Sequence, residues 1–217
     1  MNLSERWSQL WIRMGCQRGP TRQLADLLSR YAQPWRAYHT ISHIQHCLTE
    51  LDGARHLCRK PEEVEAAIWY HDAVYDPKAN DNEEKSAQLA QKSIAGILGG
   101  TNPLFAGRVA ELIQATKHAR SQGADPDMLL LLDVDLAILG QSRPDFEDYE
   151  RNIRREFEWV ELSVYCRERA KILRRLAWPT VFQTPFFQER YEAAAQDNLS
   201  RSIALLENQM LPGWPLR

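Results

Sequence analysis

The chain has 217 residues, of which 44% are hydrophobic and 26% charged, as in globular proteins with a sizeable core. This composition excludes a disordered, collagen-like or fibrous chain. The 27 basic and 29 acidic residues give a net charge of −2 and are interleaved, so no basic stripe is available for a nucleic-acid backbone. The sequence also lacks a long apolar run and a signal-peptide pattern. We therefore expect a cytoplasmic protein that binds neither macromolecular nucleic acid nor a membrane.

Glycine and proline divide the sequence into segments of helical length, and apolar residues almost never alternate strictly, so the sequence predicts an all-α fold. Pro61 suits the first turn of a helix, and Asp81 followed by Glu84 has the spacing of a capping box. No flexible linker precedes the last segment, which indicates one domain. The predicted helices cover residues 4–15, 21–31, 41–58, 61–72, 82–98, 104–119, 126–139, 145–158, 161–177 and 186–208.

Histidines are concentrated in one part of the chain. Five of the six lie between His39 and His71, and His39, His43 and His46 are spaced i, i+4 and i+7. On a helix this spacing brings the three imidazoles to one face, where they can converge on one pocket. The pattern indicates candidate metal ligands, with a solvent-exposed polar face as the alternative.

An apolar segment at residues 66–70 ends abruptly in the adjacent pair His71 and Asp72. A carboxylate is costly to bury alone, whereas a divalent cation shared with neutral imidazoles removes that cost. Imidazole and carboxylate ligands suit manganese, iron, cobalt, nickel or zinc. The pair therefore predicts a metal site at the end of this segment.

Two aspartates, Asp133 and Asp135, interrupt another apolar stretch at residues 128–139. Their directions on a helix differ by about 200°. We expect only one of them to face the histidines and the other to cap a helix or to meet solvent.

Taken in chain order, these residues resemble the H…HD…D pattern of the HD superfamily, a group of metal-dependent phosphohydrolases. Further segments look like one bacterial-type subfamily of predicted HD hydrolases, and the resemblance covers most of the chain. The segments are Tyr38-His39-x-x-x-His43-Ile44, Tyr70-His71-Asp72-x-x-Tyr75-Asp76-Pro77, Asn82-Glu83-Glu84-x-Ser86-Ala87, Ala115-Thr116-Lys117-His118, Asp133-x-Asp135-Leu136-x-x-Leu139-Gly140, Ile153-Arg154-x-Glu156-Phe157 and Asn198-Leu199.

The resemblance implies a single HD-type helical bundle over residues 1–217. Its metal-site core covers about 36–140, and further C-terminal helices at about 145–208 pack on that core. The metal ligands implied by the family pattern are His43, His71, Asp72 and Asp135, with Asp133 as a substitute for Asp135.

Two departures from the family pattern bear on the expected substrate and on the expected number of metal ions. Relatives that hydrolyse guanosine tetraphosphate often carry Glu-Asp where this chain has Tyr75-Asp76, which puts that activity in doubt. Some relatives with two metals have two further histidines downstream, and only His118 is available here. We therefore expect one ion, with His118 close to it or at a second one.

Hydrolysis of a phosphate ester needs an activated water and compensation for the phosphoryl charge, both of which a divalent ion provides. We expect Asp76 or Glu83 to orient this water or take its proton, although Asp76 also suits a turn before Pro77. His39 either lines the pocket or has a packing role. Cations that could meet the phosphate, or simply be solvated, are Lys78, Lys117, Arg154 and Arg155.

The sequence thus predicts a metal-dependent phosphohydrolase, either a phosphomonoesterase or a phosphodiesterase, acting on a nucleotide or another small phosphate ester. We expect one divalent ion, which could be Mn, Co, Ni, Fe, Mg or Zn. The alternatives are a metal- and nucleotide-binding sensor without turnover and a helical interaction protein without metal. A zinc peptidase is disfavoured because HExxH is absent. The substrate, the native metal and formation of a homodimer stay open.

Overall fold

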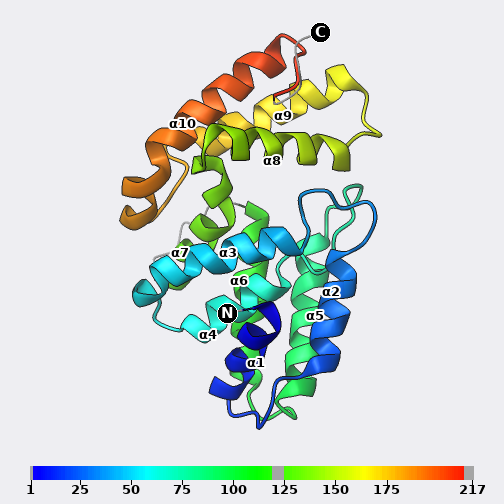
Figure 1. The fold of residues 1–217 in the computed structure, drawn as a ribbon, viewed down its shortest axis with the longest axis vertical. Helices are drawn as coiled ribbons and strands as arrows, with labels where there is room; N and C mark the ends of the chain where they lie inside the picture. Colours follow the sequence, from blue (N-terminus) through cyan, green and yellow to red (C-terminus); the bar gives the residue numbers. More distant parts are fainter. Residues whose placement is uncertain (1, 119–124, 213–217) are drawn as a thin grey trace. The chain divides into compact units, whose positions relative to one another are not determined.

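Ten α-helices and three short 3-10 helices, with no strand, make up the described part of the computed structural model, residues 2–118 and 125–212. The all-α class predicted from the sequence is confirmed. Each of the ten predicted helices is present (Figure 1). Among the described residues, no helix combines the length and apolar character that a membrane crossing requires.

The helices form two compact units, Met1–Leu131 and Leu132–Arg217. The single domain expected from the sequence stays a prediction. The helices of the first unit are α1 (Leu3–Arg13), α2 (Thr21–Tyr31), α3 (Ile41–Ala54), α4 (Pro61–Tyr70), α5 (Asn82–Ile97) and α6 (Pro103–Ala115), and α7 (Pro126–Leu136) begins there.

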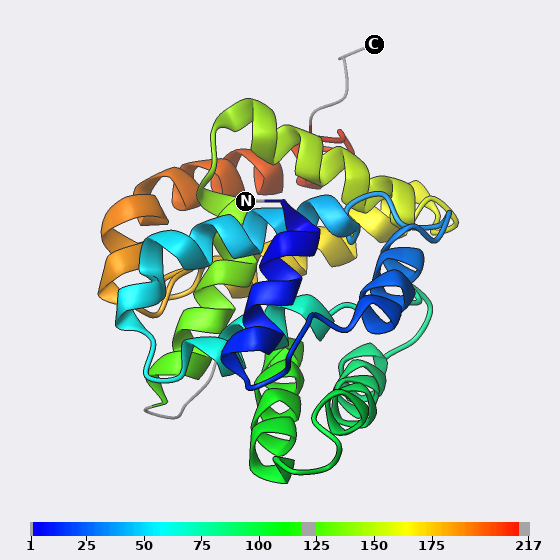
Figure 2. The same ribbon diagram turned by 60° about the horizontal axis from the view of Figure 1, so that its bottom comes forward.

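Helix α4 lies at the centre of the first unit and packs against α1, α3, α5 and α6, while α5 packs along α6 (Figure 2). The core contains a cluster of aromatic rings from α1 and α4. Trp7 makes T-shaped contacts with Trp11 and Trp69, with ring centroids 5.3 and 5.2 Å apart. Such pairs contribute about 0.5–1.5 kcal/mol each beyond the area they bury. The contact between Trp7 and Trp69 fixes α1 on α4, the helix that leads to His71 and Asp72.

Helix α4 begins at Pro61, in the first turn as predicted, without a side-chain cap of its own. The buried carboxylate of Asp127, from α7, accepts hydrogen bonds from the backbone N–H groups of Arg59 (2.7 Å) and Lys60 (2.8 Å). An aspartate distant in the sequence therefore accepts hydrogen bonds from the two backbone N–H groups that directly precede α4.

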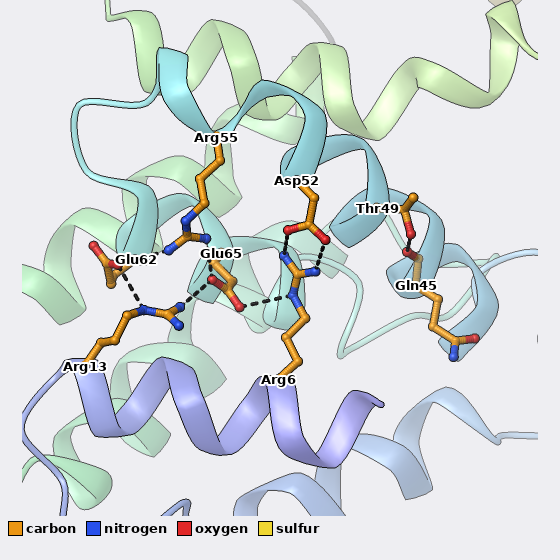
Figure 3. A network of polar contacts seen from close by, with 8 residues as sticks. All are labelled: Arg6, Arg13, Gln45, Thr49, Asp52, Arg55, Glu62 and Glu65. Atoms are coloured by element: carbon orange, nitrogen blue, oxygen red, sulfur yellow. Dashed lines mark hydrogen bonds and ion pairs between the residues drawn. The ribbon is translucent and has the colours of Figure 1, made fainter. Parts of the chain in front are cut away.

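A network of ion pairs joins α1 to α3 and α4 around Glu65, which is 1% exposed (Figure 3). Glu65 accepts hydrogen bonds from Arg6 Nε (3.2 Å), Arg13 NH2 (2.7 Å) and Arg55 NH1 (2.6 Å). Another glutamate of α4, Glu62, bonds Arg13 and Arg55 at 3.1 and 3.0 Å, and Asp52 of α3 pairs with Arg6 at 2.6 Å. Three arginines thus share the buried carboxylate of Glu65 and two more exposed carboxylates.

Several predicted helices end earlier than expected, among them the two that carry the clustered histidines. The helix expected over residues 41–58 ends at Ala54 and continues as a 3-10 turn, Arg55–Leu57. The helix expected over 61–72 ends at Tyr70, so His71 is its C-cap and Asp72 lies in the following turn. The guanidinium of Arg36 donates hydrogen bonds to the carbonyl oxygens of Asp72 and Ala73. These carbonyls are therefore not available to a helix that continues beyond Tyr70.

The capping box predicted for Asp81 and Glu84 is wrong. Asp81 is the N-cap of α5 but makes no side-chain capping bond, and its carboxylate pairs with Lys85 at 2.8 Å. Glu84 pairs instead with Lys117, 2.6 Å away. The carboxylates of Asp81 and Glu84 thus pair with lysine side chains and not with the backbone N–H groups of a capping box.

The second unit contains the 3-10 helix η3 (Ala137–Gly140) and the helices α8 (Arg143–Glu156), α9 (Leu162–Ala177) and α10 (Pro185–Glu207). Helix α10 packs against α9 and η3. Gly140 allows this contact, because a Cβ atom there would lie 2.5 Å from the Cβ of Tyr191. The predicted helix 126–139 accordingly ends at Leu136 and tightens into η3.

Asp133 is fully buried in the second unit and binds the N-cap residue of α10 and the residue before it. Its carboxylate accepts from Gln183 N (2.8 Å), Thr184 N (2.7 Å) and Thr184 Oγ1 (2.6 Å). Burial raises its pKa to about 6, and the three donors oppose this rise. Asp133 is therefore the aspartate that serves a helix terminus.

We expect Asp133→Ala to destabilise the protein by about 2–3 kcal/mol, because it leaves buried backbone donors without an acceptor. Urea denaturation measures the loss. The exposed aspartate of α10 provides the control, since Asp197→Ala should stay within about 0.5 kcal/mol of the parent. Equal effects of the two substitutions would contradict the capping role.

Candidate metal centre

Three side chains from the ends of two helices converge in the first unit. Thr40 caps α3, its hydroxyl oxygen accepting from Ser42 N at 3.3 Å, and places His43 in the first turn. His71 closes α4 in helical conformation, with φ −57° and ψ −36°, and Asp72 follows it. The start of one helix and the end of another thus bring the three predicted ligands together.

The three candidate ligand atoms lie within 3.6 Å of one another. The two Nε2 atoms of His43 and His71 are 3.1 Å apart, and Asp72 Oδ2 lies 3.6 and 3.2 Å from them. The imidazoles are 1% and 2% exposed and the carboxylate is 19% exposed. The cluster is therefore buried on its histidine side and reaches solvent through Asp72.

Hydrogen bonding determines which nitrogen of His71 carries a proton in the neutral ring. Its Nδ1 lies 2.9 Å from the carbonyl oxygen of Ile68, which can only accept, so Nδ1 is the donor. The lone pair of Nε2 then points toward His43 and Asp72. This backbone contact is the usual way in which a protein orients a metal-binding histidine.

Asp72 is held in its ionised form. Burial raises the pKa of its carboxyl group, but His71, His39 and His43 together lower it more, and the net result is a pKa well below the usual range. A carboxylate and two imidazole nitrogens that share so small a volume form a donor set that a cation between them would stabilise.

A divalent ion fits this donor set. Two metal–nitrogen bonds of about 2.0–2.1 Å at a tetrahedral angle separate their nitrogens by about 3.3 Å, close to the observed 3.1 Å. Imidazole and carboxylate oxygen are also the ligand types of the borderline divalent metals. His43, His71 and Asp72 form a group that could hold a metal ion.

Arg36 fixes the backbone around this cluster, and sequence reasoning missed it. The guanidinium is 7% exposed and donates to the carbonyls of His39 (2.8 Å), Asp72 (2.8 Å) and Ala73 (3.3 Å). It also lies over the ring of Tyr31, 5.2 Å from the centroid. One side chain therefore joins the loop before α3 to the turn after α4, the two segments that carry the ligands.

We expect Arg36→Lys to weaken metal binding by about 10–100-fold, because an ammonium group cannot reproduce the planar fork that reaches both segments. Titration of the metal-free protein with Mn²⁺ or Co²⁺ measures this loss. Arg169→Lys is a matched control, since Arg169 is a buried arginine of the second unit that pairs with Glu150. The account of Arg36 fails if both variants bind metal as the parent does.

His39 does not share a helix with His43, contrary to the expectation from their spacing, because α3 begins only at Ile41. Its ring stacks on Tyr75, 4.2 Å away with an interplanar angle of 28°, and lies 6.0 Å from the ring of His43. His39 therefore lies beside the cluster and is one of the groups that lower the pKa of Asp72.

The candidate acid–base residues follow the cluster along the chain. Asp76 is exposed, and its Oδ1 accepts from Lys78 N at 2.9 Å, which is the turn role considered for it. Lys78 is exposed as well. Glu83 lies in the first turn of α5, partly exposed. Lys117 donates to Glu84 and to the carbonyl of Asn80 at 2.9 Å.

The remaining candidates lie in the second unit or outside the described side chains. Asp135 is half-buried on the part of α7 that belongs to the second unit, and its role as fourth ligand stays a prediction. Arg154 donates to the carbonyls of Phe157 (2.7 Å) and Val160 (3.0 Å) and so holds the end of α8. Arg155 is exposed and donates to Asn152. The side chain of His118 lies outside the described part of the chain.

Cys47 is a second residue that the sequence interpretation did not place at the site. The thiol is buried one turn after His43 on α3, and its Sγ lies 3.7 Å from both ring nitrogens of His43. The i, i+4 spacing from His43 was the signal that could have indicated this contact.

No protein-family model, curated protein or solved structure matches the chain in the three comparisons made.

Proposed function

We propose that the chain is a metal-dependent phosphohydrolase of the HD superfamily, acting in the cytoplasm on a nucleotide or another small phosphate ester. The observation that carries this proposal is the convergence of His43, His71 and Asp72, with Nε2 atoms 3.1 Å apart. We propose Asp135 as the fourth ligand, in keeping with the sequence pattern. The bound divalent ion would acidify a water molecule and polarise the phosphate.

Residues of the chain would position the metal ligands and accept a proton in this reaction. Arg36 and the carbonyl of Ile68 hold the ligands in position. The solvent-facing side of the cluster, at Asp72, is where a substrate phosphate would enter. Asp76 or Glu83 would accept the proton of the attacking water. A bond forms between the water oxygen and phosphorus, the ester P–O bond breaks, and the leaving alcohol oxygen receives a proton.

Phosphate release across a panel of nucleotides and sugar phosphates tests the proposal. The purified protein is first stripped with a chelator and then supplied with Mn²⁺, Co²⁺ or Ni²⁺. We expect turnover that disappears on chelation and returns with metal. Binding of metal and nucleotide without release of phosphate would instead identify a sensor module.

A further inference from the structure

Trp35 is exposed beside the candidate metal centre. It lies in the loop between α2 and α3, and its side chain is 48% exposed, whereas Trp7, Trp11 and Trp69 of the same unit are at most 1% exposed. A tryptophan can bury 150–250 Å² of surface, so leaving half of one in solvent forgoes much stabilisation.

The exposed ring is nevertheless held in place. The indole N–H of Trp35 donates to the carbonyl oxygen of Tyr75, 3.0 Å away, across two loops. Because the N–H edge is used by this bond, the exposed surface of the ring is made mainly of its carbon atoms. A fixed aromatic ring offers binding surface at a small entropic cost.

Two ring contacts and a backbone hydrogen bond connect the proposed metal ligands to this tryptophan. His39 lies 6.0 Å from His43 on one side and stacks at 4.2 Å on Tyr75 on the other. The carbonyl of Tyr75 then binds Trp35. Arg36 lies over the Tyr75 ring, 5.3 Å from its centroid, and fixes the turn that carries Asp72. The position of Trp35 is thereby tied to that of the metal ligands.

We propose that Trp35 binds the base of a nucleotide whose phosphate lies at His43, His71 and Asp72. This inference rests on the proposed function and deepens it by naming the substrate class as mononucleotides. An aromatic side chain stacks on any base, since every base has a π-face, and such stacking contributes about 1–3 kcal/mol. A sugar phosphate offers no comparable ring.

The test compares binding of adenosine 5′-monophosphate and ribose 5-phosphate, which share the phosphate and the sugar but differ in the base. Affinity is measured by isothermal titration of Mn²⁺-loaded protein for ligands that are not cleaved during the titration, and as KM for ligands that are. The variants are Trp35→Ala, Trp35→Leu and Trp35→Phe. Trp159→Ala, which removes a tryptophan 53% exposed in the second unit, is the matched control. Trp35→Leu retains apolar volume without an aromatic face, should alanine impair folding.

We expect Trp35→Ala and Trp35→Leu to weaken binding of the nucleotide by about 10-fold, within the range of one stacked base. Trp35→Phe should restore most of the affinity, and ribose 5-phosphate should bind all variants equally. Equal losses for both ligands would show that Trp35 only supports the loop, and unchanged nucleotide binding would also overturn the proposal. If nucleotide binding depends on Trp35 but no phosphate is released, the base-binding proposal holds and the proposed hydrolase function is wrong.

Discussion

Asp72→Ala is expected to reduce the rate of phosphate release by more than about 100-fold, because loss of a metal-ligating carboxylate should exceed the 10–100-fold cost of losing an outer-shell partner. Of the three clustered side chains, Asp72 has the most access to solvent, at 19% exposure, and it carries the negative charge of the cluster. Its loss leaves two imidazoles and the proposed ligand Asp135, which together hold a divalent ion less tightly than the complete set. Steady-state kinetics with saturating Mn²⁺ measures the effect on kcat/KM.

Asp26→Ala is the control for this experiment. Asp26 lies on α2, is 54% exposed and pairs with Arg30 one turn along the helix, outside the proposed site. We expect this variant to retain the activity of the parent. Turnover in Asp72→Ala close to that of Asp26→Ala would remove the basis for a catalytic metal at this cluster.

The largest expected effect on stability belongs to Glu65→Gln, at about 3–5 kcal/mol. Breaking a buried ion pair by neutralising one partner leaves the other charge without compensation. Here the substitution leaves Arg6, which is 7% exposed, with Asp52 as its remaining carboxylate partner, and Arg13 and Arg55 with Glu62. Three arginines then face two partly exposed carboxylates, so one positive charge of the network lacks a partner. Urea denaturation monitored by helical circular dichroism measures the free energy of unfolding.

Glu62→Gln is the matched comparison, because Glu62 lies on the same helix and bonds two of the same arginines. Its side chain is 28% exposed, so solvent screens these pairs and the loss should stay below about 1 kcal/mol. If both variants lose the same small amount, burial of Glu65 does not determine the strength of the network.

The helices could be predicted from the sequence because their signals are local. Apolar spacing and the positions of Pro61, Pro103 and Pro185 indicate where helices lie, and all three prolines occupy the first turn of a helix. The positions at which the helices end depend on residues distant in the sequence. Arg36 keeps the carbonyl of Asp72 out of a continued α4, and no pattern within residues 61–72 indicates that contact.

The same distinction applies to the candidate site. The pattern of His43, His71 and Asp72 could be recognised because the three residue types are chemically distinctive and follow in order. Arg36 resembles any loop arginine in the sequence, and its role depends on carbonyls of residues 39, 72 and 73. The capping role of Asp133 likewise depends on Thr184, fifty-one positions further along the chain.

Metal content of the purified protein tests the central claim most directly. After reconstitution with Co²⁺ and removal of excess ion, the parent chain and His56→Ala should each retain about one equivalent, because His56 lies outside the three-residue group. His43→Ala and His71→Ala should retain far less while keeping their helical content. Full metal occupancy in His71→Ala, or none in the folded parent, would contradict a metal centre at these residues.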